Sequence, residues 1–257
     1  MSASRRSAPV PTPITLSEEG GVRYLHFGTP WVQGAMRISN PDALVLDYVQ
    51  QMMGWLLFVA PPARVLQLGL GAGSLTRFVL ARCPASAVTV VECSDEVIDT
   101  ARAWFALPGN GARLRVRRAD AGEFVARVAE RGRYGVVQVD LYDMHARGPA
   151  IERAGFYRDC AAVLAEPGVC VVNLFGRHAS YRRNRDRIER AFGGRVLELP
   201  ALRAGNRVVL GFRGPPLAVE WSALERRARL LRRALGLPAH EWVQALRARS
   251  DAAACVV

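Results

Sequence analysis

A glycine-rich turn between an apolar segment and a helical segment constrains the fold of this chain more than any other feature. Residues 68–74 read LGLGAGS, after the apolar segment Arg64–Leu68 and before helical periodicity that extends to about Arg82. The three glycines, Gly69, Gly71 and Gly73, let the backbone turn sharply and let a ligand approach main-chain atoms. The spacing is GxGxG, without the last glycine of the GxGxxG dinucleotide fingerprint. A tight strand-to-helix turn also needs glycine, so the motif favours a nucleotide fold without establishing it.

Strands and helices alternate after this turn. The predicted strands are Arg64–Leu68, Ala87–Val91, Leu114–Arg117, Tyr134–Val139, Gly168–Leu174, Val196–Leu199 and Asn206–Phe212, of which the last two can pair antiparallel. The predicted helices between them are Asp95–Phe105, with Ser94 as cap, Glu123–Glu130, Gly155–Leu164 and Arg182–Phe192. This alternation is typical of an α/β fold with a Rossmann-like, methyltransferase-type, doubly wound and mainly parallel sheet. Ligands of such sheets bind beyond the carboxyl ends of the strands, so functional side chains are expected there.

Four regions are predicted along the chain. Residues 1–13 are rich in Ser, Ala and Pro and are expected to form a flexible leader. Residues 14–62 are expected to hold a short β segment (Val22–Phe27 and Trp31–Ile38) and a helix of about Asp42–Val59 that ends before Pro61. Residues 63–214 then form the Rossmann-like nucleoside-binding domain, and residues 215–257 a helical C-terminal tail.

The basic charge of the chain raises the question of a nucleic-acid partner. The net charge is +12, and all 35 basic residues are arginine. A complete absence of lysine indicates a coding bias of the source rather than selection for phosphate contacts. The densest groups, Arg182–Arg190 and Arg226–Arg233, have helical periodicity, which is typical of solvated or snorkelling helix faces. A nucleic-acid partner is therefore not favoured.

The spacing of the cysteines and the length of the apolar runs indicate the cellular compartment of the protein. The five cysteines are widely spaced without a CxxC pair, and no two of the four histidines have the i, i+4 spacing of a helical metal site, so neither a disulfide framework nor a metal site is predicted. No run of about 18 uncharged apolar residues is present, and the N-terminus has no apolar stretch of signal-peptide length. The sequence predicts a cytoplasmic protein without a membrane segment.

Carboxylates stand at or just after the ends of three predicted strands. Glu92 lies 23 residues after Gly69, where an acid can accept both hydroxyl protons of a ribose or be an ordinary surface acid. Asp120 follows the third strand, where it can accept an adenine amino proton or cap the next helix. Asp140 and Asp143 follow the fourth strand, where they can hold a cationic amine, act as a base, or be loop acids or caps.

In this order the motifs resemble the spermidine synthase (polyamine aminopropyltransferase) family over residues 31–211. VECSDEVI at 91–98 is similar to the ribose-binding strand and helix of that family, and ADAGEF at 119–124 resembles its adenine-side segment. DLYD at 140–143 fits its DxxD loop, and residues 156–168 resemble the helix and turn that follow. Val32-Gln33 and Gln50-Gln51-Met52 resemble the strand and helix that border its active site.

The resemblance implies a transferase that binds decarboxylated S-adenosylmethionine and passes its aminopropyl group to a small-molecule amine, with no tightly bound cofactor. The residues implied at the nucleoside are Gly69, Gly71, Gly73, Glu92, Asp120 and Ala121. Asp140 would orient and deprotonate the attacking amine, and Asp143, Tyr142 and Gln33 would contact the substrate. The sulfonium is already a good leaving group, so the protein needs mainly alignment and a base. A homodimer is compatible with the resemblance.

Departures from the family pattern keep two alternatives open. Ala72 stands where the family has an acid that grips the aminopropyl ammonium, Gln51 stands where an acid is usual, and Val49 where a tyrosine is usual. One alternative is a methyltransferase that uses intact S-adenosylmethionine, because no acid at position 72 would then repel the methionine carboxylate. The other is a non-catalytic protein that kept the nucleoside pocket and lost amine recognition.

Overall fold

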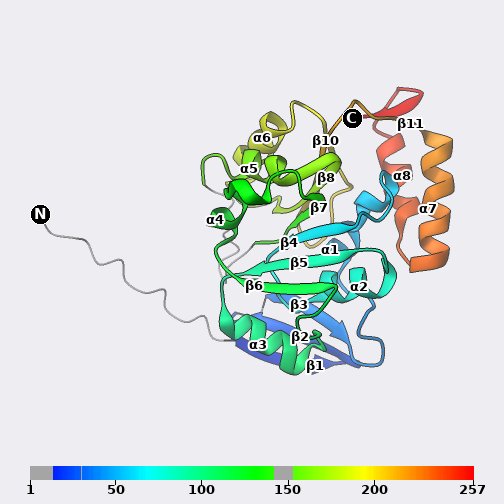
Figure 1. The fold of residues 1–257 in the computed structure, drawn as a ribbon. Coiled ribbons are helices and arrows are strands. Elements are labelled where there is room, and N and C mark those ends of the chain that lie inside the picture. Colours follow the sequence, from blue (N-terminus) through cyan, green and yellow to red (C-terminus); the bar gives the residue numbers. More distant parts are fainter. Residues whose placement is uncertain (1–13, 30, 142–152) are drawn as a thin grey trace, which may run out of the picture.

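A seven-stranded sheet forms the centre of the computed structural model, which describes residues 14–29, 31–141 and 153–257 (Figure 1). Its strand order is β6-β5-β4-β7-β8-β10-β9. The strands are β4 (Arg64–Leu68), β5 (Ala87–Glu92), β6 (Leu114–Arg118), β7 (Tyr134–Val139), β8 (Leu164–Phe175), β9 (Val196–Glu198) and β10 (Asn206–Arg213). Strands β4 to β8 are parallel, and β10 is antiparallel to both β8 and β9. The predicted methyltransferase-type sheet, including its antiparallel end, is confirmed.

Helices cover both faces of this sheet because successive apolar residues of each central strand point to opposite sides. In β7, Val136 packs in one buried cluster and Val137 in the other. The first cluster receives side chains from α2 (Ser74–Arg82) and α3 (Asp95–Trp104), and the second from α4 (Ala121–Val125), α5 (Phe156–Val163) and α6 (Tyr181–Ala191).

The cap predicted for one helix is confirmed, and one predicted helix is interrupted. The Ser94 hydroxyl accepts a hydrogen bond from the backbone N–H of Val97 at 3.2 Å, which confirms Ser94 as the cap of α3. The continuous helix expected near 123–130 is wrong, because the extended backbone of Arg127 separates α4 from a 3₁₀ turn, η2 (Val128–Glu130).

A separate three-stranded antiparallel sheet precedes the central sheet. It consists of β1 (Ile14–Glu19), β2 (Val22–Phe27) and β3 (Val32–Arg37). The β1–β2 hairpin turns through Gly20 and Gly21, whose φ angles of 57° and 73° suit a tight two-residue turn. Leu25 and Met36 of this sheet pack against Ala72 of the glycine turn. The expected β segment is confirmed, and its third strand borders the glycine turn.

The expectation of one long helix over about 42–59 is wrong. The chain forms only a short helix, α1 (Asp47–Gln51), and a 3₁₀ turn, η1 (Gly54–Leu57), with residues 42–46 outside any helix. Gly54 allows close packing of this segment, since a Cβ there would lie 2.7 Å from Cδ1 of Leu199. Tertiary packing against Leu199, just after β9, accompanies the loss of the regular helix that the periodicity predicted.

The C-terminal region contains α7 (Trp221–Leu235) and α8 (Ala239–Arg247), in agreement with the predicted helical tail. The sequence did not indicate that β11 (Ala218–Glu220) and β12 (Ala254–Val256) pair antiparallel and join the two ends of this region. In the described part of the chain, no helix has the length and apolarity needed to cross a bilayer. The division of the chain at residues 63 and 214 stays a prediction.

Candidate active site

A pocket opens at the carboxyl ends of β4 and β7. Its lining includes Gln33, Tyr48, Gly69, Gly71, Ala72 and Asp140. Four of the residues predicted for the site, Gln33, Gly69, Gly71 and Asp140, therefore lie around one cavity. Asp140 is the only charged residue among the described residues that line it.

The glycine turn brings two strand ends into direct contact. Gly69, Gly71 and Gly73 have φ angles of 92°, 50° and 69°, a region that favours glycine. A Cβ on Gly69 would overlap the carbonyl oxygen of Asp140. The Asp140 backbone N–H donates to the Leu68 carbonyl at 2.9 Å. Glycine at position 69 is thus required for the approach of Asp140 to the turn, in addition to any role toward a ligand.

Glu92 fastens the same turn to the end of β5. Its Oε2 accepts the backbone N–H of Leu70 at 3.0 Å, and its Oε1 accepts that of Ser94 at 2.9 Å. The Cys93 side chain also hydrogen-bonds to this carboxylate. A carboxylate has about four acceptor sites, so these three contacts leave acceptor capacity beside the glycine turn. The Glu92 carboxylate is therefore held in a fixed orientation beside the glycine turn.

Asp120 caps a helix in this structure. Its Oδ1 accepts the backbone N–H of Glu123 at 2.9 Å and pairs with Nη1 of Arg153 at 3.0 Å. The Ala119 backbone N–H donates to the Glu92 carbonyl at 3.0 Å, so Asp120 follows directly beside the end of β5. Ala121 is buried as the first residue of α4. The capping alternative is observed, and a contact with adenine stays a prediction.

A chain of side-chain hydrogen bonds orients Asp140. Asn173 Nδ2 donates to Asp140 Oδ1 at 2.9 Å, and Asn206 Nδ2 donates to Asn173 Oδ1 at 3.0 Å. The side chain of Tyr48 also hydrogen-bonds to the Asp140 carboxyl. Burial raises the pKa of the Asp140 carboxyl, and the bonds from Asn173 and Tyr48 act in the opposite direction. A carboxylate with a raised pKa is better suited to accept a proton than an exposed one.

Buried polar contacts hold the helix that carries Tyr48. Gln67 Nε2 donates to Gln138 Oε1 at 2.9 Å, and Gln138 Nε2 donates to the Met52 carbonyl, just after α1, at 2.9 Å. This chain connects β4 and β7 to α1. The orientation of Tyr48 toward Asp140 is therefore supported by the sheet itself.

Arg77 holds the other side of the glycine turn. This buried residue donates from Nη1 to the carbonyls of Ala72 and Phe105 at 2.5 and 2.6 Å, and from Nε to the carbonyl of Pro41 at 2.8 Å. Burial lowers the pKa of the Arg77 guanidinium to about 10, while the charge of Asp42 raises it. The turn is thus fixed to the neighbouring loops by a charged side chain that sequence reasoning did not single out.

Sequence reasoning also missed Tyr48, Asn173 and Asn206. A signal exists for Asn173, which is the polar residue near the end of the otherwise apolar predicted strand Gly168–Leu174. No comparable signal marks Tyr48 or Asn206, because their contacts join distant parts of the chain. Tyr142 and Asp143 lie outside the described residues.

Comparison with known proteins identifies the relationship. Residues 45–178 match the family model of the spermine/spermidine synthase domain. The chain belongs to the spermine/spermidine synthase family. A polyamine aminopropyltransferase from Chromobacterium violaceum is 36% identical over 91% of this chain and 89% of its own length. One from Neisseria meningitidis serogroup B is 37% identical over the same shares. Family membership supports a transferase role.

Solved structures share the fold. A probable spermidine synthase from Corynebacterium glutamicum superposes with a TM-score of 0.70 at 22% identity, over 90% of this chain and 89% of that chain. Human methyltransferase-like protein 13, solved in complex with SAH, gives a TM-score of 0.66 at 23% identity over 75% and 93%. The spermine/spermidine synthase fold is thus shared with methyltransferases.

The departures from the family pattern have distinct structural settings. Ala72 is buried, and a Cβ on Gly34 of β3 would lie 2.5 Å from its Cβ, so its side chain faces β3. Gln51 is buried, donates from Nε2 to the Pro200 carbonyl at 2.9 Å and does not line the pocket at Asp140. Although position 49 is Val, the adjacent Tyr48 supplies a phenol to Asp140.

Proposed function

We propose that this chain transfers an aminopropyl group from decarboxylated S-adenosylmethionine to a small-molecule amine. The observation that carries the proposal is the Asp140 carboxylate, oriented by Asn173 and Tyr48 and in backbone contact with the glycine turn. Family membership over residues 45–178 supports the same reaction.

In the proposed reaction, a nitrogen lone pair of the acceptor attacks the carbon next to the sulfonium. The new C–N bond forms as the C–S bond breaks, and the sulfur leaves with the bonding electrons as a neutral thioether. The amine proton passes to Asp140. A partly buried carboxylate suits this step, because its raised pKa makes it a stronger base while the pocket aligns the two reactants.

The nucleoside is proposed to lie along the glycine turn and the end of β5. Glu92 would accept ribose hydroxyl protons with the acceptor capacity that Leu70, Ser94 and the Cys93 side chain leave unused. The contacts of Asp120 with Glu123 and Arg153 both use Oδ1, so Oδ2 would accept the adenine amino proton, beside Ala121. Gln33 would border the nucleoside, and Asp143 and Tyr142 would contact the amine.

Asp140, the only charged side chain among the described residues that line the pocket, favours the decarboxylated form of the cosubstrate. A methionine carboxylate would bring a second negative charge near Asp140, which is unfavourable in a partly buried site. The protonated aminopropyl group carries no such penalty.

Incubation of the protein with decarboxylated S-adenosylmethionine and a panel of diamines tests the proposal. We expect an aminopropylated amine and the thioether nucleoside in equal amounts, detected by mass spectrometry. Absence of both products across the panel would contradict it and would favour a nucleoside-binding protein without turnover.

A methyltransferase is the second candidate. Ala72 in place of an acid favours it, as does a partial relationship to the bovine eEF1A lysine and N-terminal methyltransferase, 30% identical over 47% of this chain and 18% of that protein. Methyl transfer from labelled S-adenosylmethionine to an amine acceptor, without aminopropyl transfer, would establish this alternative.

A further inference from the structure

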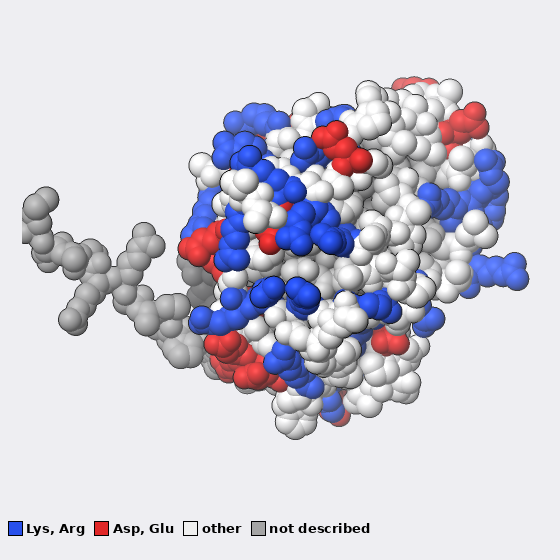
Figure 2. All heavy atoms as spheres, in the orientation of Figure 1, with Lys and Arg blue, Asp and Glu red and all other residues white. Residues whose placement is uncertain are grey.

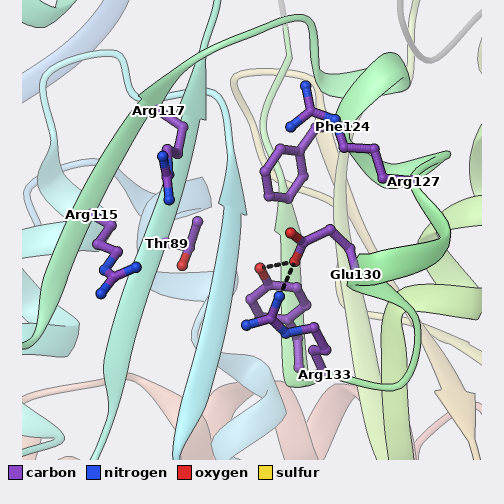
Figure 3. A pocket seen from close by; sticks show the side chains of 8 residues that line it. Thr89, Arg115, Arg117, Phe124, Arg127, Glu130 and Arg133 are labelled. Atoms are coloured by element: carbon purple, nitrogen blue, oxygen red, sulfur yellow. Dashed lines mark hydrogen bonds and ion pairs between the residues drawn. The ribbon is translucent and has the colours of Figure 1, made fainter.

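A second pocket lies near the β6 edge of the central sheet (Figure 3). Its walls come from β6 on one side and from α4, η2 and the start of β7 on the other. It arises because α4 ends at Val125 and the chain then turns through η2 instead of continuing as a helix over β5 and β6. None of its lining residues lines the pocket at Asp140.

Two arginines project into this pocket from the edge strand. Arg115 and Arg117 are two positions apart in β6, so their side chains leave the same face of the strand, as Figure 3 shows. Both are exposed, and neither has a carboxylate partner in the part of the chain that the structure describes. Two adjacent guanidinium groups without a counter-charge repel each other.

The opposite wall contributes two more arginines. The guanidinium carbon of Arg127 lies 5.3 Å from the centroid of the Phe124 ring, and this cation–π contact holds the charged group beside the pocket. Arg133 pairs with Glu130 at 3.3 Å. Figure 2 shows that basic side chains gather on this face of the molecule, over β6 and α4.

The acidic group of the pocket is already engaged. Tyr134 donates its phenolic hydrogen to Glu130 Oε2 at 2.7 Å, and the same oxygen pairs with Arg133. Burial, together with this bond, raises the pKa of Tyr134 to about 12, so its hydroxyl keeps its proton. Thr89 also hydrogen-bonds to Tyr134. Four arginines and one engaged glutamate leave a formal excess of positive charge around one recess.

We propose that this recess binds a small phosphate-bearing anion. Guanidinium groups pair with phosphate through two parallel N–H···O bonds, and a phosphate has enough oxygen atoms to engage arginines from both walls at once. The four arginines border one recess of about 180 Å³, a size that suits a small anion better than the backbone of a nucleic acid. The site is independent of the reaction proposed at Asp140.

The proposal is tested by calorimetric titration with pyrophosphate and with inorganic phosphate. The titrations are made at about 0.15 M salt, so that interactions between exposed charges are screened. We expect saturable binding at one site per chain for at least pyrophosphate. Replacement of both edge arginines (Arg115→Gln with Arg117→Gln) should weaken it at least about tenfold, because charge-assisted hydrogen bonds are lost.

The matched control removes two exposed arginines of α7, Arg229→Gln with Arg233→Gln, which leaves the same net charge as the test variant. Its affinity for pyrophosphate should equal that of the unmodified protein. The single variant Arg127→Gln, on the opposite wall, should also weaken pyrophosphate binding. It replaces the double variant as the test if the double variant fails to fold. No saturable binding, or equal weakening in the α7 control, would overturn the proposal. Binding of a single-stranded RNA oligonucleotide in place of pyrophosphate would overturn it as well.

Discussion

Asn173 Nδ2 lies 2.9 Å from Asp140 Oδ1 and donates a hydrogen bond to it. Asp140 directly follows β7, Asn173 lies in the neighbouring parallel strand β8, and Asn206 of β10 in turn donates to Asn173. A bond to the charged form of a carboxyl stabilises that form. The sheet thus adjusts the basicity of Asp140 through a neighbour that does not line the pocket.

Loss of this bond should change the pH dependence of the reaction. Asn173→Ala removes a donor that holds the pKa of Asp140 down, so the pKa should rise. Because the reaction needs the carboxylate, the acidic limb of the kcat/KM profile should move to higher pH. Asn206→Ala leaves the direct bond intact and should move the limb less. An unchanged limb in Asn173→Ala would contradict the proposed role of Asp140.

Replacement of Asp140 itself should separate turnover from binding. Asp140→Asn keeps the size of the side chain but removes the base, so aminopropyl transfer should fall by roughly a factor of 100 or more. Nucleoside affinity, measured by calorimetry, should stay within about threefold, as expected when only a transition-state contact is lost. Asp99→Asn, an exposed change in α3, is the control and should keep full activity. Normal turnover in Asp140→Asn would exclude Asp140 as the base.

Glu92 should control nucleoside affinity. Glu92→Gln removes the charge and leaves one oxygen for the contacts that two now make with Leu70 and Ser94. Affinity for the nucleoside should fall by about ten- to a hundredfold, the range for lost charge-assisted hydrogen bonds. Glu96→Gln, in the exposed first turn of α3, is the matched control. Equal affinity in the two variants would exclude a ribose contact by Glu92.

Close packing between β3 and the glycine turn should limit substitution at Gly34. A Cβ there would lie 2.5 Å from the Cβ of Ala72, so Gly34→Ala should displace the turn. Urea unfolding should report a loss of about 1–3 kcal/mol, typical of overpacking, together with weaker nucleoside binding. Gly109→Ala adds a Cβ that meets nothing within 4 Å and should change neither quantity. A Gly34→Ala variant as stable as this control would contradict the packing described.

The central sheet could be predicted because its strands are short apolar runs that follow one another with helices between them. Val136 and Val137, for example, are both buried because helices cover both faces, which gives an unbroken apolar signal. Caps such as Ser94 are equally local and were predictable. The break between α1 and η1 was not, since this segment packs against Leu199, which is far away in the sequence.

Only some residues of the candidate site could be predicted from the sequence, for the same reason. Glu92 and Asp140 stand at strand ends, where the parallel fold brings ligand-binding residues. The bonds that give Asp140 its chemistry come from Tyr48 and Asn173, on a distant helix and on the next strand. Position 72 carried a local signal, but only the structure shows that its side chain faces Gly34.

The proposed use of decarboxylated S-adenosylmethionine is tested most directly by calorimetry. The same protein is titrated with the decarboxylated and with the intact form, side by side. We expect tighter binding of the decarboxylated form, because Asp140 is the only charged residue among the described residues that line the pocket and would oppose a second carboxylate. Tighter binding of intact S-adenosylmethionine would contradict aminopropyl transfer in favour of methyl transfer. Binding of neither form would contradict a nucleoside site at the glycine turn.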